Sequence, residues 1–240
     1  MMAGIFPNTH PKMTRRWFAN RSFRVPRLWS NEELRRVCQI FGGTVVNVSA
    51  WRDEDKEGGH YRDYFPTATR YYTTNYEGIR GTAEDDGQTN FALDLSAPLP
   101  DKMCGRFDVV FNHTTLEHVF EMRQAFRNLC LMSRDVVIVV VPFAQEMHST
   151  ESFGDFWRFT PQGVRALFAE NGLTTIYEAT SPQRNAGVYL LSIGSLHPQR
   201  WQSRLPAWQP VRKVGEWIGR PAWQRFLAVV SSRWSVVSKH

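Results

Sequence analysis

At 240 residues the chain has the length of one domain with short extensions, and it can bury a sizeable core. Its three cysteines, Cys38, Cys104 and Cys130, form no CxxC pair, which argues against a disulfide framework and indicates a reducing compartment. No apolar run approaches the roughly 20 residues of a membrane-spanning helix, and the N-terminus lacks the apolar core of a signal peptide. These features predict a soluble cytoplasmic protein.

The positive charge is concentrated at the two ends of the chain. Residues 1–30 carry six Lys/Arg and no acid, and residues 197–240 carry eight Lys/Arg and a single acid, Glu216. Because the whole chain has a net charge of +6, residues 31–196 carry −7. We therefore expect a basic N-terminal arm (1–30), an acidic central domain (31–196) and a basic C-terminal extension (197–240). Basic ends alone are weak evidence for nucleic-acid binding, and we predict none.

A helix and three strands are predicted first along the chain. Ser30 and Glu33 have the spacing of a capping box, which predicts that a helix begins at Ser30. Gly42-Gly43 ends this helix. Three β-rich runs follow, at 44–48, 69–74 and 90–94. The stretch 51–66 between the first two runs is rich in charge and glycine, so it predicts an irregular loop.

The second half alternates between strands and helices. A strand at 107–111 precedes apolar residues at helical spacing from Leu116 to Cys130. Residues 135–141 are apolar on both faces, as in a central parallel strand. Thr160 and Pro161 form the N-cap and first position of another helix. Two last strands are predicted at 174–178 and 187–193.

This alternation predicts an α/β layer fold with a mostly parallel sheet. In such sheets, ligands bind beyond the carboxyl ends of the strands, near the point where the strand order reverses. Four strands end in polar residues, and these ends lie at 47–51, 75–77, 94–96 and 112–115. We expect them to cluster at one binding site; the alternative is that each is a solvated loop.

Two stretches, LDLSAPLPDKMCGRFDVVFNHTTLEHV from Leu93 and FGDFWRFTPQGVRALFAENGL from Phe153, resemble class I S-adenosylmethionine-dependent methyltransferases (methyltransferase type 11-like), especially those that modify small molecules and glycans. The first stretch has the acid after strand three, the Leu-Pro pair, the FDVV strand and the LEHV motif of that family. The second stretch is similar to the family's DYWRFTP segment. The likeness covers roughly residues 30–195.

The resemblance implies a doubly wound, mostly parallel seven-stranded sheet (a Rossmann-like methyltransferase fold) with its last strand antiparallel, and S-adenosylmethionine as cofactor. It implies that Asp94 accepts a hydrogen bond from the adenine amino group and that Leu95 packs near the ring. The ribose hydroxyls would meet Asn75, with Glu77 as a rival. Asn112 and His113 would lie beside the methionine end and the reacting methyl group. The remaining implied cofactor contacts are Asn47, Ser49 and Trp51.

The first loop departs from the family pattern. Asn47 stands where the family has an acid, and Ser49 and Trp51 stand where glycines are expected. Trp51 either points outward, while the backbone of Ser49 and Ala50 keeps its cofactor contacts, or fills the pocket and leaves a non-catalytic domain. We prefer the outward orientation, because polar residues at the other strand ends are retained.

His113 is the leading candidate for a general base, because imidazole serves that role near neutral pH. His118 and Glu117 are weaker candidates for site residues. His113 and His118 are five positions apart, about 140° around a helix, so HTTLEH predicts no metal site. Asp53-x-Asp55 has the form of a metal-binding pair, but its basic neighbours favour a self-neutralised surface.

Three residues are candidates for the acceptor pocket: Tyr64, Trp157 and Arg158. An aromatic ring with a guanidinium suits a sugar or a carboxylate-bearing substrate. An equally good alternative is that Arg158 pairs with Asp155 and Trp157 packs over the sheet.

The C-terminal extension holds five of the nine tryptophans, interleaved with basic residues. This composition suits peripheral contact with a membrane, docking on a protein partner, or packing against the acidic domain. We favour the last. The sequence thus predicts methyl transfer from S-adenosylmethionine to a small-molecule or glycan acceptor; the alternative is a scaffold or binding domain that has lost the cofactor.

Overall fold

A computed structural model describes residues 24–76, 88–151, 153–181 and 188–212. Seven strands form one sheet in the order β3-β2-β1-β4-β5-β7-β6. Their bounds are Gly43–Val48 (β1), Ala68–Asn75 (β2), Asn90–Ala92 (β3), Phe107–His113 (β4), Ser133–Pro142 (β5), Thr174–Thr180 (β6) and Tyr189–Ser195 (β7). All pairs are parallel except those of β7, which runs antiparallel to β5 and β6. The predicted doubly wound sheet with an antiparallel last strand is confirmed.

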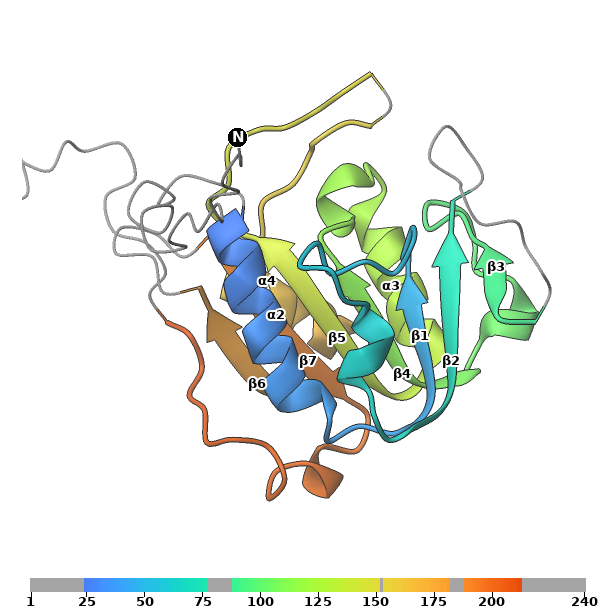
Figure 1. Ribbon diagram of the computed structural model, residues 1–240, viewed down its shortest axis with the longest axis vertical. Coiled ribbons are helices and arrows are strands. Elements are labelled where there is room, and N and C mark those ends of the chain that lie inside the picture. The colour runs from blue at the N-terminus through green and yellow to red at the C-terminus, as the bar shows by residue number, and fades with distance from the viewer. Residues whose placement is uncertain (1–23, 77–87, 152, 182–187, 213–240) are drawn as a thin grey trace, which may run out of the picture.

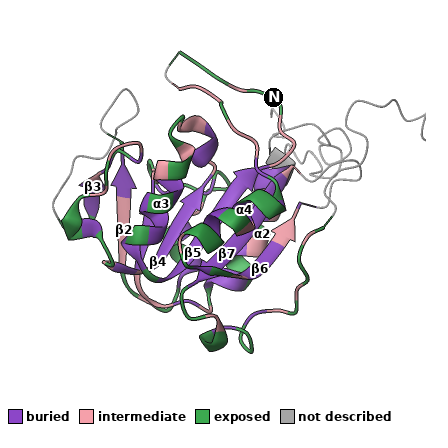
Figure 2. Ribbon diagram, turned by 180° about the vertical axis from the view of Figure 1, so that it is seen from behind, coloured by how far each residue is buried: buried purple, intermediate pink, exposed green. Residues whose placement is uncertain are grey.

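Helices cover both faces of the sheet. Helix α2 (Arg24–Cys38) lies on one face, and α3 (Met122–Met132) and α4 (Pro161–Glu170) lie on the other (Figure 1). Seen from the second face, the central strands β4, β5 and β7 are buried, β2 and β6 are only partly buried, and the outward sides of α3 and α4 are exposed (Figure 2). The central strand β5 contributes alternate residues to both cores, Ile138 to the α2 side and Val139 to the α3 side. This is why its sequence is apolar at every position.

The start of α4 follows its sequence closely. The Thr160 side chain accepts a hydrogen bond from the backbone N–H of Gly163 at 3.0 Å, and Pro161 occupies the first turn. Gly172 follows the helix with a φ of 78°, a left-handed conformation that glycine adopts readily. The predicted N-cap and stop are both confirmed.

The predicted start of the first helix is wrong. Helix α2 begins at Arg24, so Ser30 lies inside it and donates its hydroxyl to the carbonyl of Arg27 at 2.9 Å. The Glu33 carboxylate bonds to Arg36 and to the hydroxyl of Tyr177 instead of closing a capping box. Pro26 does not prevent the early start, because a first helical turn needs no N–H donor there. The expected division at residue 30 therefore falls within a helix.

The helical spacing from Leu116 onward covers two elements. A short 3-10 helix, Leu116–His118 (η4), precedes α3, and residues 119–121 separate them. The carbonyl of Glu117 accepts hydrogen bonds from the N–H groups of Phe156 and Trp157. These contacts come from a distant segment, so local periodicity could not reveal the break.

The described part of the C-terminal extension, residues 197–212, packs against the domain. Trp201 is buried with its ring centroid 4.7 Å from that of Phe41, and Arg200 pairs with Asp135 at 3.1 Å. Trp217, Trp223 and Trp234 lie outside the described residues, and so does most of the basic arm. A cytoplasmic location and a peripheral contact through the extension stay predictions.

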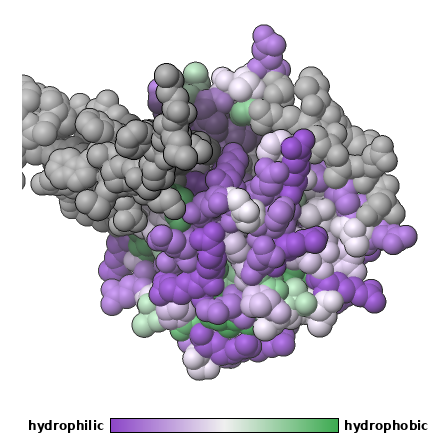
Figure 3. Space-filling model, in the orientation of Figure 1, coloured by the Kyte–Doolittle hydropathy of each residue, from purple (hydrophilic) through white to green (hydrophobic). Residues whose placement is uncertain are grey.

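The face that carries α2 is mainly hydrophilic where it is visible in Figure 3. Among the described residues, no helix combines the length and the apolar character that crossing a bilayer requires.

Candidate functional site

The carboxyl ends of four strands meet at one edge of the sheet, the upper edge in Figure 1. Val48 of β1 is paired with Thr74 in β2 and with Asn112 in β4, and Asn75 is paired with Ala92 in β3. The strand order reverses between β1 and β4, where the crossover loops leave in opposite directions. This is the position at which doubly wound sheets bind their ligands.

The first part of the loop after β1, residues 49–53, makes glycine-like turns without glycine. Ser49, Trp51 and Asp53 all have a positive φ, at 59°, 53° and 60°. Each such residue costs on the order of 1–2 kcal/mol relative to ordinary backbone. Hydrogen bonds to β2 offset part of this cost: the N–H of Trp51 donates to the Asn75 side-chain oxygen at 2.5 Å, and that of Ala50 donates to the Thr74 carbonyl at 2.9 Å. Contacts with β2 therefore hold this loop in the conformation that glycine would otherwise favour.

The Trp51 side chain lies on the surface. It is 44% exposed, and the Arg52 guanidinium stacks over its ring at 5.2 Å. Of the two orientations considered from the sequence, the structure has the outward one.

Two buried carboxylates hold this loop closed. Asp53 accepts from the Asn47 amide and the Tyr71 hydroxyl, both at 2.7 Å, and from the N–H of Arg62 at 3.0 Å. The Asn47 side-chain amide is consequently directed into the loop. The pair Asp53-x-Asp55 is structural, although its partners are distant side chains and backbone groups and not the basic neighbours that the sequence suggested.

Asp55 has a similar role. It accepts from the Tyr64 hydroxyl at 2.8 Å, from the N–H groups of Glu57 and Gly59, and from Arg35 at 3.1 Å. Despite burial, which acts in the opposite direction, these donors hold the pKa of Asp55 below its ordinary value. Tyr64 is buried, and the Arg35 guanidinium lies over its ring at 4.7 Å. This places Tyr64 in the packing between the loop and α2.

The predicted cofactor residues beyond this loop have different surroundings. Asn75 is buried and also donates to the Asn90 side chain at 3.1 Å, so both ends of its amide have partners. Asp94 is exposed, with one oxygen accepting from the N–H and hydroxyl of Ser96. Leu95 is buried in the core beneath it.

Asn112 lies at the switch point and is fully buried. Its side-chain nitrogen donates to the Val48 carbonyl at 2.9 Å, which ties β4 to β1. Its side-chain oxygen has no hydrogen-bond partner within the described part of the chain. A buried acceptor without a donor is costly, typically 1–3 kcal/mol, so this oxygen can accept from a donor that the described residues do not supply.

His113 is enclosed by the N-terminal half of α2. Its ring lies 2.6 Å from Arg27 Nη1 and 3.0 Å from Ser30 Oγ, with Tyr61 and Tyr189 as aromatic neighbours. Burial, and then the positive charge of Arg27, lower the pKa of His113 well below its ordinary value. The ring is therefore neutral near pH 7. The sequence missed Arg27 as a neighbour because residues 24–30 were assigned to the arm.

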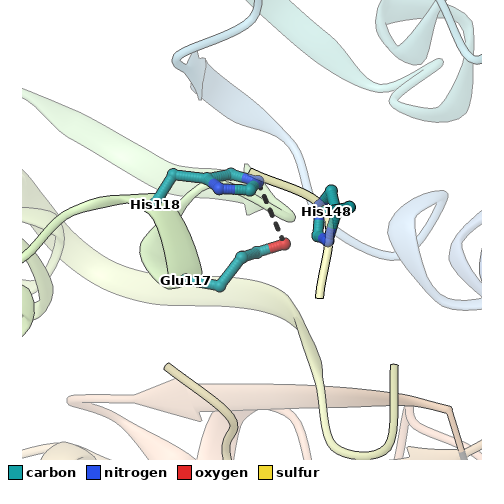
Figure 4. A group of neighbouring side chains, drawn as sticks. All are labelled: Glu117, His118 and His148. Carbon is teal, nitrogen blue, oxygen red and sulfur yellow. Dashed lines mark ion pairs between the residues drawn. The ribbon is translucent and has the colours of Figure 1, made fainter. Parts of the chain in front are cut away.

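Glu117, His118 and His148 come together above the ends of β4 and β5 (Figure 4). Glu117 is fully buried, and neither of its carboxylate oxygens has a hydrogen-bond partner among the described residues. Burial raises the pKa of Glu117 to about 8. From the sequence, His118 and Glu117 were weak candidates, and the 30 residues between His118 and His148 leave no local pattern that would join them.

Trp157 and Arg158 are held by neighbouring segments. The Trp157 indole N–H donates to the Val119 carbonyl at 3.0 Å, and Arg158 makes two bonds to Asp155 at 2.5 and 2.7 Å. The Arg158 guanidinium holds the pKa of Asp155 well below its usual range. The ion pair that the sequence left as an alternative is therefore present.

Sequence reasoning missed an exposed aromatic pair beside Trp157. Phe120 is 63% and Phe156 50% exposed, with ring centroids 5.4 Å apart. Phe120 follows the LEHV motif, and Phe156 lies inside DFWRF. The positions of these two phenylalanines, directly beside motif residues, could have indicated from the sequence that they belong to the site.

Comparisons with known proteins establish the class of fold. No protein-family profile matches the chain, and no curated protein matches its sequence. Among solved structures, it is similar to a complex of the Haloferax volcanii Trm112 methyltransferase activator and a putative methyltransferase (TM-score 0.54, 13% identity, covering 75% of this chain and 94% of that one).

Two further structures are similar. One is the Burkholderia thailandensis 1,6-didemethyltoxoflavin-N1-methyltransferase with bound substrate and S-adenosylhomocysteine (TM-score 0.50, 15% identity, 80% and 92% coverage). The other is an S-adenosylmethionine-dependent methyltransferase from Mesorhizobium loti (TM-score 0.50, 11% identity, 70% and 97% coverage). The chain has the class I S-adenosylmethionine-dependent methyltransferase fold.

Proposed function

We propose that this chain binds S-adenosylmethionine at the carboxyl ends of β1–β4 and transfers its methyl group to a small-molecule or glycan acceptor. The observation that carries the proposal is the buried, unpartnered side-chain oxygen of Asn112 at the switch point. An ammonium group such as that of the cofactor's methionine end is a suitable donor for it. The Burkholderia thailandensis neighbour, crystallised with S-adenosylhomocysteine, supports the choice of cofactor.

The residues at this edge suit the cofactor in part. Asp94 is exposed and retains a carboxylate oxygen for an adenine amino group, while Leu95 packs beneath it. The left-handed backbone at Ser49 and Trp51 stands in for the glycine-rich turn of the family. Asn47 and Asn75 are committed to the loop and contribute by holding its shape.

The bound cofactor would supply an electrophilic methyl group, so the protein contributes mainly by positioning the acceptor in line with it. Phe120, Phe156 and Trp157 offer an aromatic surface for one face of an acceptor ring. His113, neutral near pH 7, is the candidate general base for a hydroxyl acceptor, although its lowered pKa makes it a weak base.

A non-catalytic scaffold is the second candidate. It is favoured by the side chains of Asn47, Asn75 and Asp53, which close the first loop with no ligand needed. Titration calorimetry with S-adenosylmethionine distinguishes the two. We expect saturable binding of one equivalent in the micromolar range; absence of binding at millimolar cofactor would establish the scaffold.

A substitution tests the assigned pocket. Asp94→Ala removes the adenine acceptor and should weaken cofactor binding about tenfold, the value of one hydrogen bond. Asp101→Ala, which removes another exposed carboxylate nearby in sequence, is the matched control and should leave the affinity unchanged. Equal affinities for the Asp94→Ala variant and the unmodified chain would mean that the adenine lies elsewhere.

A further inference from the structure

A second polar cluster lies above the ends of β4 and β5. It consists of Glu117 and His118 of η4 and His148 of the segment that follows β5. One ligand-type atom from each residue lies within 4.8 Å of the others. Figure 4 shows the Glu117 carboxylate and the two imidazoles directed toward a common space.

Glu117 is the residue that most needs a partner. Its side chain is fully buried, and neither carboxylate oxygen has a hydrogen-bond partner among the described residues. Nε2 of His118 lies 3.8 Å from one of these oxygens, beyond hydrogen-bond distance. A buried carboxylate with no donor is expensive to maintain, and a bound cation would satisfy it.

The histidines are oriented as metal ligands commonly are. His118 Nδ1 lies 2.6 Å from the Gly154 carbonyl, which can only accept, so Nδ1 carries the proton and Nε2 presents its lone pair toward Glu117. His148 Nδ1 lies 3.1 Å from an Asp155 oxygen, which gives it the same tautomer. Metal-binding histidines usually donate their second nitrogen to a carbonyl or carboxylate in this way.

Asp155 is itself fixed in place. It accepts two hydrogen bonds from Arg158 and one from the N–H of His148. The Trp157-Arg158 motif thus supports the orientation of His148 through Asp155.

We propose that Glu117, His118 and His148 bind one divalent transition-metal ion of the zinc type. Two imidazoles and one carboxylate suit Zn²⁺ and its first-row neighbours and disfavour Mg²⁺ and Ca²⁺, which prefer oxygen ligands. Ligands of a tetrahedral zinc site lie about 3.4 Å apart at bond lengths near 2.1 Å. The 3.8 Å separation of Glu117 and His118 therefore needs only a small adjustment.

This site does not pair the two histidines of HTTLEH, in agreement with the spacing that excluded them as a joint metal site. His113 is directed to Arg27 and Ser30, while His118 joins Glu117 and a histidine 30 residues later. Three protein ligands leave a fourth position for water or a substrate oxygen. The inference goes beyond methyl transfer and does not depend on cofactor binding.

The test is a titration of the full-length, tag-free chain with Co²⁺ after treatment with a chelator. We expect one equivalent to bind with the visible absorption of a low-coordinate site and to be displaced by Zn²⁺. Glu117→Gln and His148→Ala should each weaken binding at least tenfold. His197→Ala removes an exposed histidine at the opposite edge of the sheet and is the matched control, with unchanged affinity.

Thermal unfolding gives an independent measurement. Zn²⁺ should raise the melting temperature of the unmodified chain and of His197→Ala, because the ion binds only the folded state, but not that of Glu117→Gln. Glu117→Gln keeps size and polarity, so it decides the question even if His148→Ala unfolds. Failure of the unmodified chain to bind Co²⁺, or equal binding by Glu117→Gln, would overturn the proposal.

Discussion

At the scale of single residues, the contact between Arg27 and His113 defines the protonation state of the site. A guanidinium donates and cannot accept, so the imidazole nitrogen 2.6 Å from Arg27 Nη1 must present a lone pair. Ser30, Thr114, Tyr61 and Tyr189 also contact this ring, and none of these side chains carries a negative charge near neutral pH. Protonation of His113 would place two cations together in a buried space.

This arrangement predicts that His113 destabilises the fold in mild acid. The pKa of His113 is lowered in the folded state, so between that pKa and about 6.5 only the unfolded chain takes up the proton. His113 should therefore lower the free energy of unfolding by up to about 2 kcal/mol as the pH falls from 7 to 5, while Glu117, whose pKa is raised to about 8 in the folded state, acts in the opposite direction.

Urea unfolding of His113→Gln at both pH values measures this contribution. Relative to the unmodified chain, its free energy of unfolding should rise by up to about 2 kcal/mol as the pH falls from 7 to 5. The remaining pH dependence of the variant includes His118, because burial also lowers the pKa of that histidine. His197→Gln is the control for loss of an exposed histidine. An unchanged slope in His113→Gln would mean that His113 titrates normally.

At the scale of elements, the loop between β1 and β2 shows how side chains replace glycine. Ser49, Trp51 and Asp53 hold left-handed backbone only because the chain on either side is fixed. Asp53 is the central contact, since it joins Asn47 in β1, Tyr71 in β2 and the N–H of Arg62 in the 3-10 helix Tyr61–Tyr64 (η2).

Asp53→Ala should therefore be strongly destabilising. It leaves an amide, a hydroxyl and a backbone N–H without their acceptor, and we expect a loss of about 2–4 kcal/mol in the free energy of unfolding. Denaturant titration gives the value. Glu54→Ala, which removes the exposed neighbouring carboxylate, should change stability by less than about 0.5 kcal/mol. Similar losses in both variants would show that the hydrogen bonds of Asp53 do not contribute to the free energy of unfolding.

At the scale of the whole molecule, the elements that the sequence predicted correctly are those marked by a local pattern of residues. The apolar run of β5 and the Thr160-Pro161 start of α4 are local signals, and both elements lie where expected. The start of α2 at Arg24 was missed, because the side chains of Arg27 and Ser30 are stabilised by His113, far along the chain.

The same reasoning explains which parts of the site were foreseen. The polar strand ends were visible because the topology of parallel sheets brings them to one edge. The meeting of Glu117 with His148 depends on the path of residues 143–160, which no periodicity describes. Likewise, the commitment of Asn75 to the Trp51 backbone follows from a loop conformation that the residue types alone do not specify.

The described part of the C-terminal extension contacts two distant parts of the domain, the residues that follow α2 and strand β5. Trp201 packs on Phe41 at the end of the α2 region and donates its indole N–H to Asp135 at 3.1 Å, while Leu205 is buried beside it. Trp208, in the same segment, is only partly buried and meets Tyr177 at 6.4 Å. Replacing each tryptophan by alanine therefore compares a buried indole, that of Trp201, with a partly buried one, that of Trp208.

We expect Trp201→Ala to lower the free energy of unfolding by about 3 kcal/mol, because it opens a cavity over Phe41 and leaves Asp135 with one donor fewer. Trp208→Ala should cost about 1 kcal/mol or less, since little buried surface is lost. Hydrogen exchange provides the second measurement: the hydrogen-bonded amides within residues 200–205 should lose protection in Trp201→Ala and keep it in Trp208→Ala. Protection that persists in Trp201→Ala would contradict this prediction. It would mean that Arg200 and Arg204 hold the segment through their contacts to Asp135 and to the Ile40 carbonyl. Ionic anchoring of that kind would weaken with added salt, whereas burial of Trp201 would not.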